Sequence, residues 1–153
     1  MHKQQFKISI NAPKEVVWNS LWEDASYREW TSAFTPDSHA VTDWKKGSKI
    51  LFLDGSDDGM VSQVADRRDN EYMSIQHIGI IQKGVEILDA PETKDWQGFE
   101  NYTLKTVNGK TEVVVELQFN HIKEEYLYHF NEAFPKALEI LKQISERRVK
   151  ETV

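Results

Sequence analysis

The C-terminal part of the chain carries the pattern that most restricts the fold. Between Asn120 and Arg148, apolar residues recur at helical spacing and share one face of a wheel drawn at about 100° per residue. The spacing predicts one long helix over 120–148, with Asn120 as N-cap and a kink or break at Pro135, because proline removes a backbone donor. Such a helix must cover another apolar surface. The apolar face consists of Leu127, Phe130, Phe134, Ala137, Leu138, Leu141 and Ile144.

The middle of the chain has a different period. From about His39 onward, apolar and polar residues alternate, which is typical of half-buried strands. Asn108-Gly109, between two alternating runs, is a strong hairpin signal. Because one face of these strands is polar, we expect an antiparallel sheet, and we expect a loop over 81–98. The predicted strands are 39–44, 48–53, 60–67, 71–80, 99–107 and 110–119.

The N-terminal part supplies the remaining elements. Phe6, Ile8 and Ile10 alternate as in a strand, and Pro13 suits the first turn of a short helix. A second short helix is predicted around 26–34. The chain length of 153 residues fits a single domain over 1–153, in which the long helix covers the apolar face of the sheet. A curved sheet around a helix tends to leave a cavity between them.

Composition narrows the classes of partner. The net charge is −6 with the signs interspersed, which argues against nucleic acid as a partner because phosphate binding needs clustered Lys and Arg. The chain has no cysteine, so disulfide and thiolate chemistry are excluded. No apolar run has the length of a signal-peptide core or of a membrane span. We therefore expect a cytoplasmic protein that does not bind membranes.

Several short motifs along the chain resemble those of one superfamily. They are Ile10-Asn11-Ala12-Pro13 leading into Val16-Val17-Trp18, then Tyr27-Arg28-Glu29-Trp30, Trp44-Lys45-Lys46-Gly47-Ser48, Asp54-Gly55 and Gly59. With the long C-terminal helix, they resemble the START-like (SRPBCC) superfamily, and within it most of all the homologues of the heat-shock-chaperone ATPase activator. The likeness covers nearly the whole chain. Pro135 departs from it, since the family has an unbroken helix there.

The resemblance implies an α+β helix-grip fold. In that fold a curved antiparallel sheet of about six to seven strands wraps on the long C-terminal helix, with two short helices after the first strand. Members of the superfamily include lipid carriers, hormone receptors and cyclases. We favour a small-molecule binding module for an apolar or amphipathic ligand. The alternatives are a chaperone-associated or stress-response interaction protein, and a cyclase- or hydrolase-like enzyme using the same cavity.

Aromatic and apolar side chains at strand and helix spacing are candidates for the lining of the cavity. His77 and Glu100 share strand faces with apolar residues, so both are expected to project inward, where an acid and an imidazole could perform acid–base chemistry. The alternatives are a filled core and a sheet edge where both groups reach water. Tyr102 and His77 would fix the polar end of a ligand, and the segment 27–34 and the loop around Trp96 would gate its entry. The predicted ligand-binding residues are Trp30, Phe34, Phe52, Met73, His77, Glu100, Tyr102, Phe130 and Phe134.

Two patterns superficially resemble metal sites. His121, Glu125 and His129 recur every four residues, but they share the polar face of the predicted helix and lack a fourth ligand. The segment 54–59 resembles a calcium loop without its closing glutamate, so we interpret it as a hairpin turn. No metal, cofactor or catalytic residue is therefore predicted.

Overall fold

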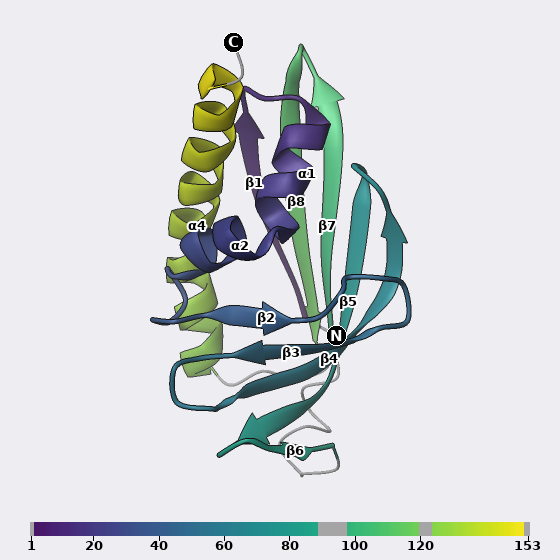
Figure 1. Ribbon diagram of the computed structural model, residues 1–153, viewed down its shortest axis with the longest axis vertical. Coiled ribbons are helices and arrows are strands. Elements are labelled where there is room, and N and C mark those ends of the chain that lie inside the picture. Colours follow the sequence, from purple (N-terminus) through teal and green to yellow (C-terminus); the bar gives the residue numbers. More distant parts are fainter. Residues whose placement is uncertain (1, 89–97, 120–123, 152–153) are drawn as a thin grey trace.

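The computed structural model describes residues 2–88, 98–119 and 124–151 (Figure 1). It contains one antiparallel sheet and three described helices, in the predicted order of strand, two short helices, strands and long helix. The elements are β1 (His2–Ile10), α1 (Lys14–Trp22), α2 (Asp24–Thr31), β2 (His39–Val41), β3 (Lys49–Leu53), β4 (Gly59–Arg68), β5 (Tyr72–Gln82), β6 (Val85–Ile87), β7 (Gly98–Val107), β8 (Lys110–Phe119) and α4 (Glu124–Glu151).

The sheet is strongly curved. Its strands follow the order β1-β8-β7-β5-β4-β3-β2, and β6 pairs with β5 beside this path. Strands β7 and β8 run along the molecule whereas β2, β3 and β4 run across it, and α4 lies beside α1, α2 and β1 (Figure 1). In β8, Val113, Val115 and Leu117 are buried while the residues between them are partly exposed. The α+β fold with an antiparallel sheet covered by a long helix is therefore confirmed.

Helix α4 supplies much of the core. Phe134, Ala137, Leu138, Leu141 and Ile144 are all buried, as the helical wheel predicts. The helix extends beyond the predicted end to Glu151, and Asn120 lies outside the described residues. No helix in the described part of the chain is both long and apolar enough to cross a membrane.

The predicted break at Pro135 is wrong. Helix α4 continues through this residue without interruption. Proline cannot donate to the carbonyl four residues earlier, which belongs to Asn131. Because Asn131 and Pro135 are both exposed, that carbonyl can bond to water, and the apolar face of the helix is undisturbed.

Two predicted hairpin turns are confirmed. Asn108 and Gly109 both have positive φ angles, 53° and 79°, as a two-residue turn between strands requires. Between β3 and β4, Asp54 Oδ1 accepts hydrogen bonds from the backbone N–H groups of Ser56 and Asp58. The segment that resembles a calcium loop is therefore a turn that uses its own first carboxylate.

Two strands differ from the sequence-based expectation. Strand β2 ends at Val41 because Trp44 has a φ of 59° and donates its backbone N–H to Thr42 Oγ1, 3.1 Å away, so the chain turns before residue 44. Strand β6 forms inside the segment predicted as a loop, paired with the end of β5. The rest of that segment, including Trp96, lies outside the described residues.

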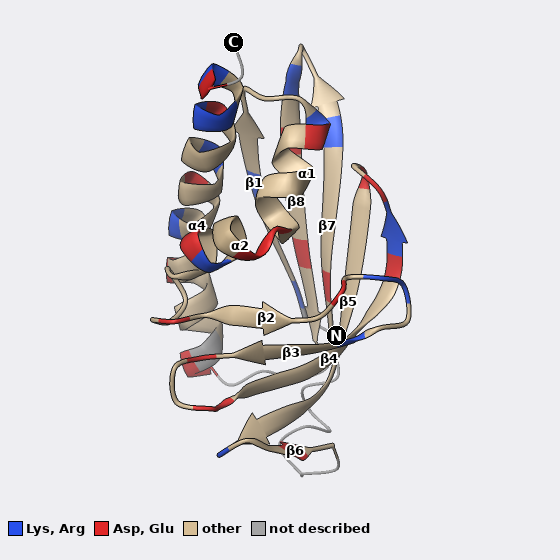
Figure 2. Cartoon of the chain, in the orientation of Figure 1, with Lys and Arg blue, Asp and Glu red and all other residues tan. Residues whose placement is uncertain are grey.

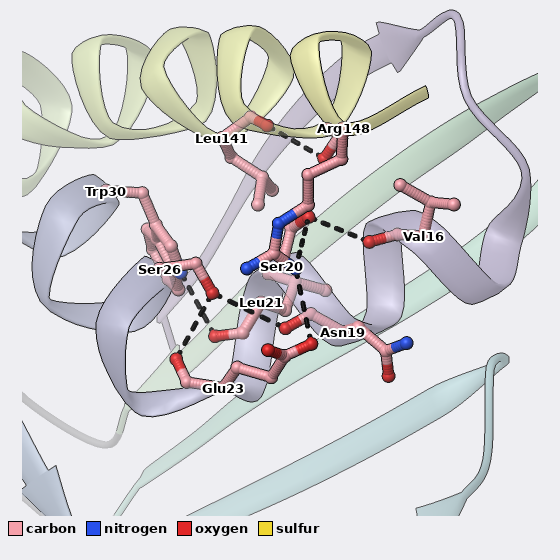
Figure 3. Close-up of polar contacts among 10 residues, drawn as sticks. Val16, Asn19, Ser20, Leu21, Glu23, Ser26, Trp30, Leu141 and Arg148 are labelled. Carbon is pink, nitrogen blue, oxygen red and sulfur yellow. Dashed lines mark hydrogen bonds and ion pairs between the residues drawn. The ribbon is translucent and has the colours of Figure 1, made fainter. Parts of the chain in front are cut away.

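A polar cluster fixes α2 against its neighbours (Figure 3). Arg148 of α4 donates to Ser20 Oγ and to Glu23 Oε1, each at 3.3 Å. The indole N–H of Trp30 donates to the Leu21 carbonyl at 3.1 Å. These bonds satisfy polar groups at the corner between α1 and α2 and set the orientation of the Trp30 ring.

Candidate ligand-binding cavity

A cavity of about 220 Å³ lies between α2, the β3–β4 hairpin, β7 and the first half of α4. Asp58 and His129 at its rim are exposed, so the cavity opens to solvent there. It is lined by Tyr27, Trp30, Thr31, Phe34, Thr35, Ser38, Phe52, Leu53, Asp54, Asp58, Gly59, Met60, Glu100, Tyr102, His129, Phe130 and Phe134.

Aromatic rings form the apolar walls. Phe34, just after α2, meets Phe134 of α4 edge to face with ring centroids 4.7 Å apart. Trp30 lies edge to face with Tyr102 at 6.3 Å, and the Tyr27 and Phe52 rings are stacked at 6.3 Å. Because these rings come from α2 and the segment after it, β3, β7 and α4 and pack on one another, they hold the walls open without a ligand.

Polar groups form the floor of the cavity. The Tyr102 hydroxyl donates to Glu100 Oε2, and His77 Nε2 lies 3.4 Å from Glu100 Oε1. On the other side of the imidazole, Ser62 Oγ lies 2.7 Å from His77 Nδ1. The strands place these groups together, since Ser62 is paired with His77 and Glu100 with Ile75, two residues from His77. The result is a continuous polar chain, Ser62–His77–Glu100–Tyr102, with its last two members facing the cavity.

Tyr102, the last member of this chain, and nearby Tyr27 keep neutral hydroxyls over an extended pH range. Burial raises the pKa of Tyr102 well above its usual value of 10.0, and the charge of Glu100 raises it further. Burial raises the pKa of Tyr27 in the same way, again with Glu100 as the second cause. A phenolate in this apolar site would be desolvated and would face a carboxylate, so both hydroxyls are hydrogen-bond donors at neutral pH.

Most of the predicted site residues meet at this cavity, with two exceptions. Met73 is fully buried and does not line it. His77 lies behind Glu100, reaching the cavity only through that carboxylate, and the edge of its ring packs on Phe52 at 6.1 Å. The predicted residues that do line the cavity are Trp30, Phe34, Phe52, Glu100, Tyr102, Phe130 and Phe134. Whether these side chains bind a ligand stays a prediction.

Several lining residues are absent from the sequence-based prediction. Tyr27 could have been included, because it lies one helical turn before Trp30 and Thr31 on α2. No spacing in the sequence indicates that Asp54 and Asp58 line the cavity. Their place at the rim follows from how the β3–β4 hairpin lies relative to α4. His129 shares the rim, and the described residues contain no group of three side chains that could hold a metal ion.

The polar chain resembles a nucleophilic triad only in composition. Ser62, His77 and Glu100 follow one another, as in a serine hydrolase. However, Ser62 is fully buried and does not line the cavity, so its hydroxyl cannot reach a molecule bound there. What the arrangement can do is orient the polar end of a ligand, or exchange a proton with it through Glu100 and Tyr102.

Comparison with known proteins places the fold. No protein-family model and no curated protein matches the sequence. Among solved structures, the Aha1 dimer from Colwellia psychrerythraea is 24% identical with a TM-score of 0.71, over 93% of this chain and 94% of that one. Protein MLL2253 from Mesorhizobium loti is 16% identical with a TM-score of 0.72, over 95% and 98% of the two chains.

A third similar structure is longer. DynU16, from the dynemicin biosynthetic locus, is 13% identical with a TM-score of 0.71 over 94% of this chain, which spans only 47% of DynU16. At such identities the likenesses show the fold and not the activity. These likenesses show that the chain has the helix-grip fold.

Proposed function

We propose that this protein binds a small apolar or amphipathic molecule in the cavity between the sheet and α4. The observation that carries the proposal is an aromatic cavity with hydrogen-bonding groups gathered at one end, which is the usual construction of a small-molecule site. Trp30, Phe34, Phe52, Phe130 and Phe134 would contact the apolar body of the ligand, while Glu100 and Tyr102 would hold its polar end. His77 would act behind Glu100 by holding that carboxylate in place.

The volume sets the size of the ligand. A cavity of roughly 150 Å³ holds one benzene molecule, so about 220 Å³ encloses about nine non-hydrogen atoms by proportion. A long acyl chain would exceed this volume. A single substituted ring, or a short chain with one polar group, therefore fits, and a larger ligand would extend past the rim into solvent.

Blocking the entrance tests the proposal. Ser38→Trp places an indole at the rim and is expected to weaken binding of 2-phenylethanol, a neutral probe of suitable size, at least about tenfold. Binding is measured by ligand-observed NMR. Gln143→Trp, at an exposed position in the second half of α4 that does not line the cavity, is the control for adding an indole and should bind as the wild type does. Equal binding by wild type and Ser38→Trp, with both proteins folded, would place the probe elsewhere.

The natural ligand is best sought by native mass spectrometry of protein purified from its own host. A discrete added mass that is lost on mild activation would give the class of ligand. The same added mass should be missing from Ser38→Trp purified in parallel. Bare protein in both samples would weigh against a resident ligand.

The polar chain favours one second candidate, an enzyme with acid–base chemistry. Glu100 and Tyr102 face the cavity within hydrogen-bonding reach of one another, and His77 backs the carboxylate. A proton could therefore pass between a bound molecule and Glu100. If the ligand found by mass spectrometry is converted by the wild type but bound unchanged by Glu100→Gln, the cavity is catalytic.

The likeness to Aha1 gives a further candidate, an interaction with a chaperone. The likeness covers nearly the whole of both chains. A contact surface is available around β6, where Val85 and Leu88 have exposed fractions of 62% and 54%. Co-purification of a heat-shock chaperone with the wild type, lost in a Val85→Ser/Leu88→Ser double variant, would support this role. Retention of the chaperone by the double variant would exclude β6 as the contact.

A further inference from the structure

The charged groups that line the cavity all have the same sign. Glu100 lies on its floor, and Asp54 and Asp58 lie at its rim. No lysine or arginine is present in the described lining, where His129 at the rim is the one side chain that can carry a positive charge. Acidic segments gather around this mouth, in the β3–β4 hairpin, in the turn before β2 and at the first turn of α4 (Figure 2). Lys83 approaches the hairpin through its backbone, whose N–H donates to Asp58 Oδ1.

Glu100 keeps unused hydrogen-bonding capacity. Its Oε2 accepts from the Tyr102 hydroxyl and its Oε1 faces His77 Nε2. A neutral imidazole with its proton on Nε2 satisfies this arrangement, because Ser62 Oγ can donate to the bare Nδ1. The carboxylate then retains its negative charge and, of its roughly four lone-pair directions, has room for a donor from a ligand.

The surrounding surfaces also suit a positive charge. The faces of aromatic rings attract cations, and a cation near Glu100 would lie among the rings of Tyr27, Trp30 and Tyr102. Tyr27 also lines the cavity, so its hydroxyl can pair with the polar end of a ligand. An anionic ligand would instead face Glu100 on the floor, with His77 shielded behind that carboxylate and His129 out at the exposed rim.

We propose that the cavity selects small aromatic amines, bound with the ring between α2 and α4 and the protonated amino group at Glu100. This inference rests on the proposed ligand binding and specifies its chemistry. The ammonium group would donate to Glu100, and the acidic rim would raise the local concentration of cations at the mouth. A carboxylate of the same size is rejected, because its charge would be desolvated beside a like charge.

Three probes of similar size distinguish the possibilities. Phenethylamine, 2-phenylethanol and phenylacetate share a phenyl ring and differ in the charge of the polar end. At about pH 8, where an ordinary imidazole is mostly neutral, calorimetry is expected to show the amine binding at least about tenfold tighter than the alcohol, and phenylacetate weakest. Tightest binding of phenylacetate, or equal binding of all three, would overturn the selectivity while leaving ligand binding intact.

Glu100→Gln separates charge from shape. This variant keeps an oxygen that can accept from Tyr102, and it should reduce the preference for the amine over the alcohol to about twofold or less. Affinity for 2-phenylethanol should fall much less than affinity for phenethylamine, because the alcohol exchanges one hydrogen-bond acceptor for another whereas the ammonium loses its opposite charge. A preference that survives in Glu100→Gln would overturn the role of this carboxylate.

A matched control uses a carboxylate outside the cavity. Glu112→Gln on β8 removes the same charge from the outer face of the sheet, and it should preserve the full preference for the amine. If none of the three probes binds to the folded wild type, the proposed function itself fails, which is distinct from a loss of selectivity.

Discussion

Phe134→Ala is expected to lower the free energy of unfolding by about 3–5 kcal/mol, the usual range for removing a buried phenylalanine ring. Phe134 is 2% exposed. Its ring stacks on Phe6 of β1 with centroids 4.8 Å apart and meets Phe34 edge to face at 4.7 Å. One ring thus joins the long helix to the first strand and to the segment after α2. Because a domain of this kind is stable by only about 5–15 kcal/mol, the loss is a large fraction of the total.

Two further variants make this test specific. Phe130→Ala removes a half-buried ring one turn earlier and is expected to cost about 1–2 kcal/mol, since less apolar surface returns to water. Tyr128→Ala, at a side chain that is 69% exposed, should change stability by less than about 0.5 kcal/mol. Urea unfolding at neutral pH measures all three. A loss for Phe134→Ala no greater than that for Phe130→Ala would contradict the packing described here.

The periodicity of the sequence predicts the order of the elements and an antiparallel sheet covered by the long helix, whereas the helix-grip fold is what the family resemblance implies. Alternation in β8 and the Asn108-Gly109 turn define a hairpin through local chemistry alone, so neither depends on distant parts of the chain. The apolar face of the sequence predicts helix α4 correctly. The break predicted at Pro135 is wrong because the effect of a proline depends on whether the carbonyl left without a donor, here that of Asn131, reaches solvent. Strand β6 was missed because three residues are too few to show a period.

The cavity was only partly predictable, for a different reason. Inward-facing aromatic residues follow from strand and helix spacing, so Trp30, Phe52 and Tyr102 were accessible to sequence analysis. The acidic rim was not, because it depends on where a hairpin turn lies relative to α4. Met73 and His77 share a strand face, but Met73 is fully buried and His77 is partly exposed. The alternation of apolar and polar residues predicts which face a side chain is on, not how deeply it is buried.

Raising the pH above about 10 is expected to destabilise the protein steeply through two buried hydroxyls. Tyr102 and Tyr27 have pKa values raised by burial and then by Glu100. The folded protein therefore keeps protons that the unfolded chain loses above about pH 10. Their contribution to stability is fully present below that pH and is lost as the pH rises. Each retained proton lowers the free energy of unfolding by about 1.4 kcal/mol per pH unit, so the two tyrosines together lower it by about 2.7 kcal/mol per pH unit.

The tyrosine contribution can be isolated by difference. Tyr102→Phe should reduce the alkaline slope by about 1.4 kcal/mol per pH unit, measured by urea unfolding at several values between about pH 9 and 11.5. Tyr128→Phe removes a hydroxyl from an exposed ring and serves as the control for losing a phenol at the surface. An unchanged slope in Tyr102→Phe would mean that this hydroxyl ionises within the folded protein.

The same titration reports on the charge inside the cavity. Burial is the larger cause of both raised pKa values and would persist in Glu100→Gln, whereas the carboxylate contribution would vanish. Absorbance at about 295 nm, which follows tyrosinate, should therefore rise at a lower pH in folded Glu100→Gln than in the folded wild type. Coincident curves would show that the charge of Glu100 does not act on the buried tyrosine hydroxyls. The selection of an ammonium group would then lose its physical basis, because that selection requires the same charge.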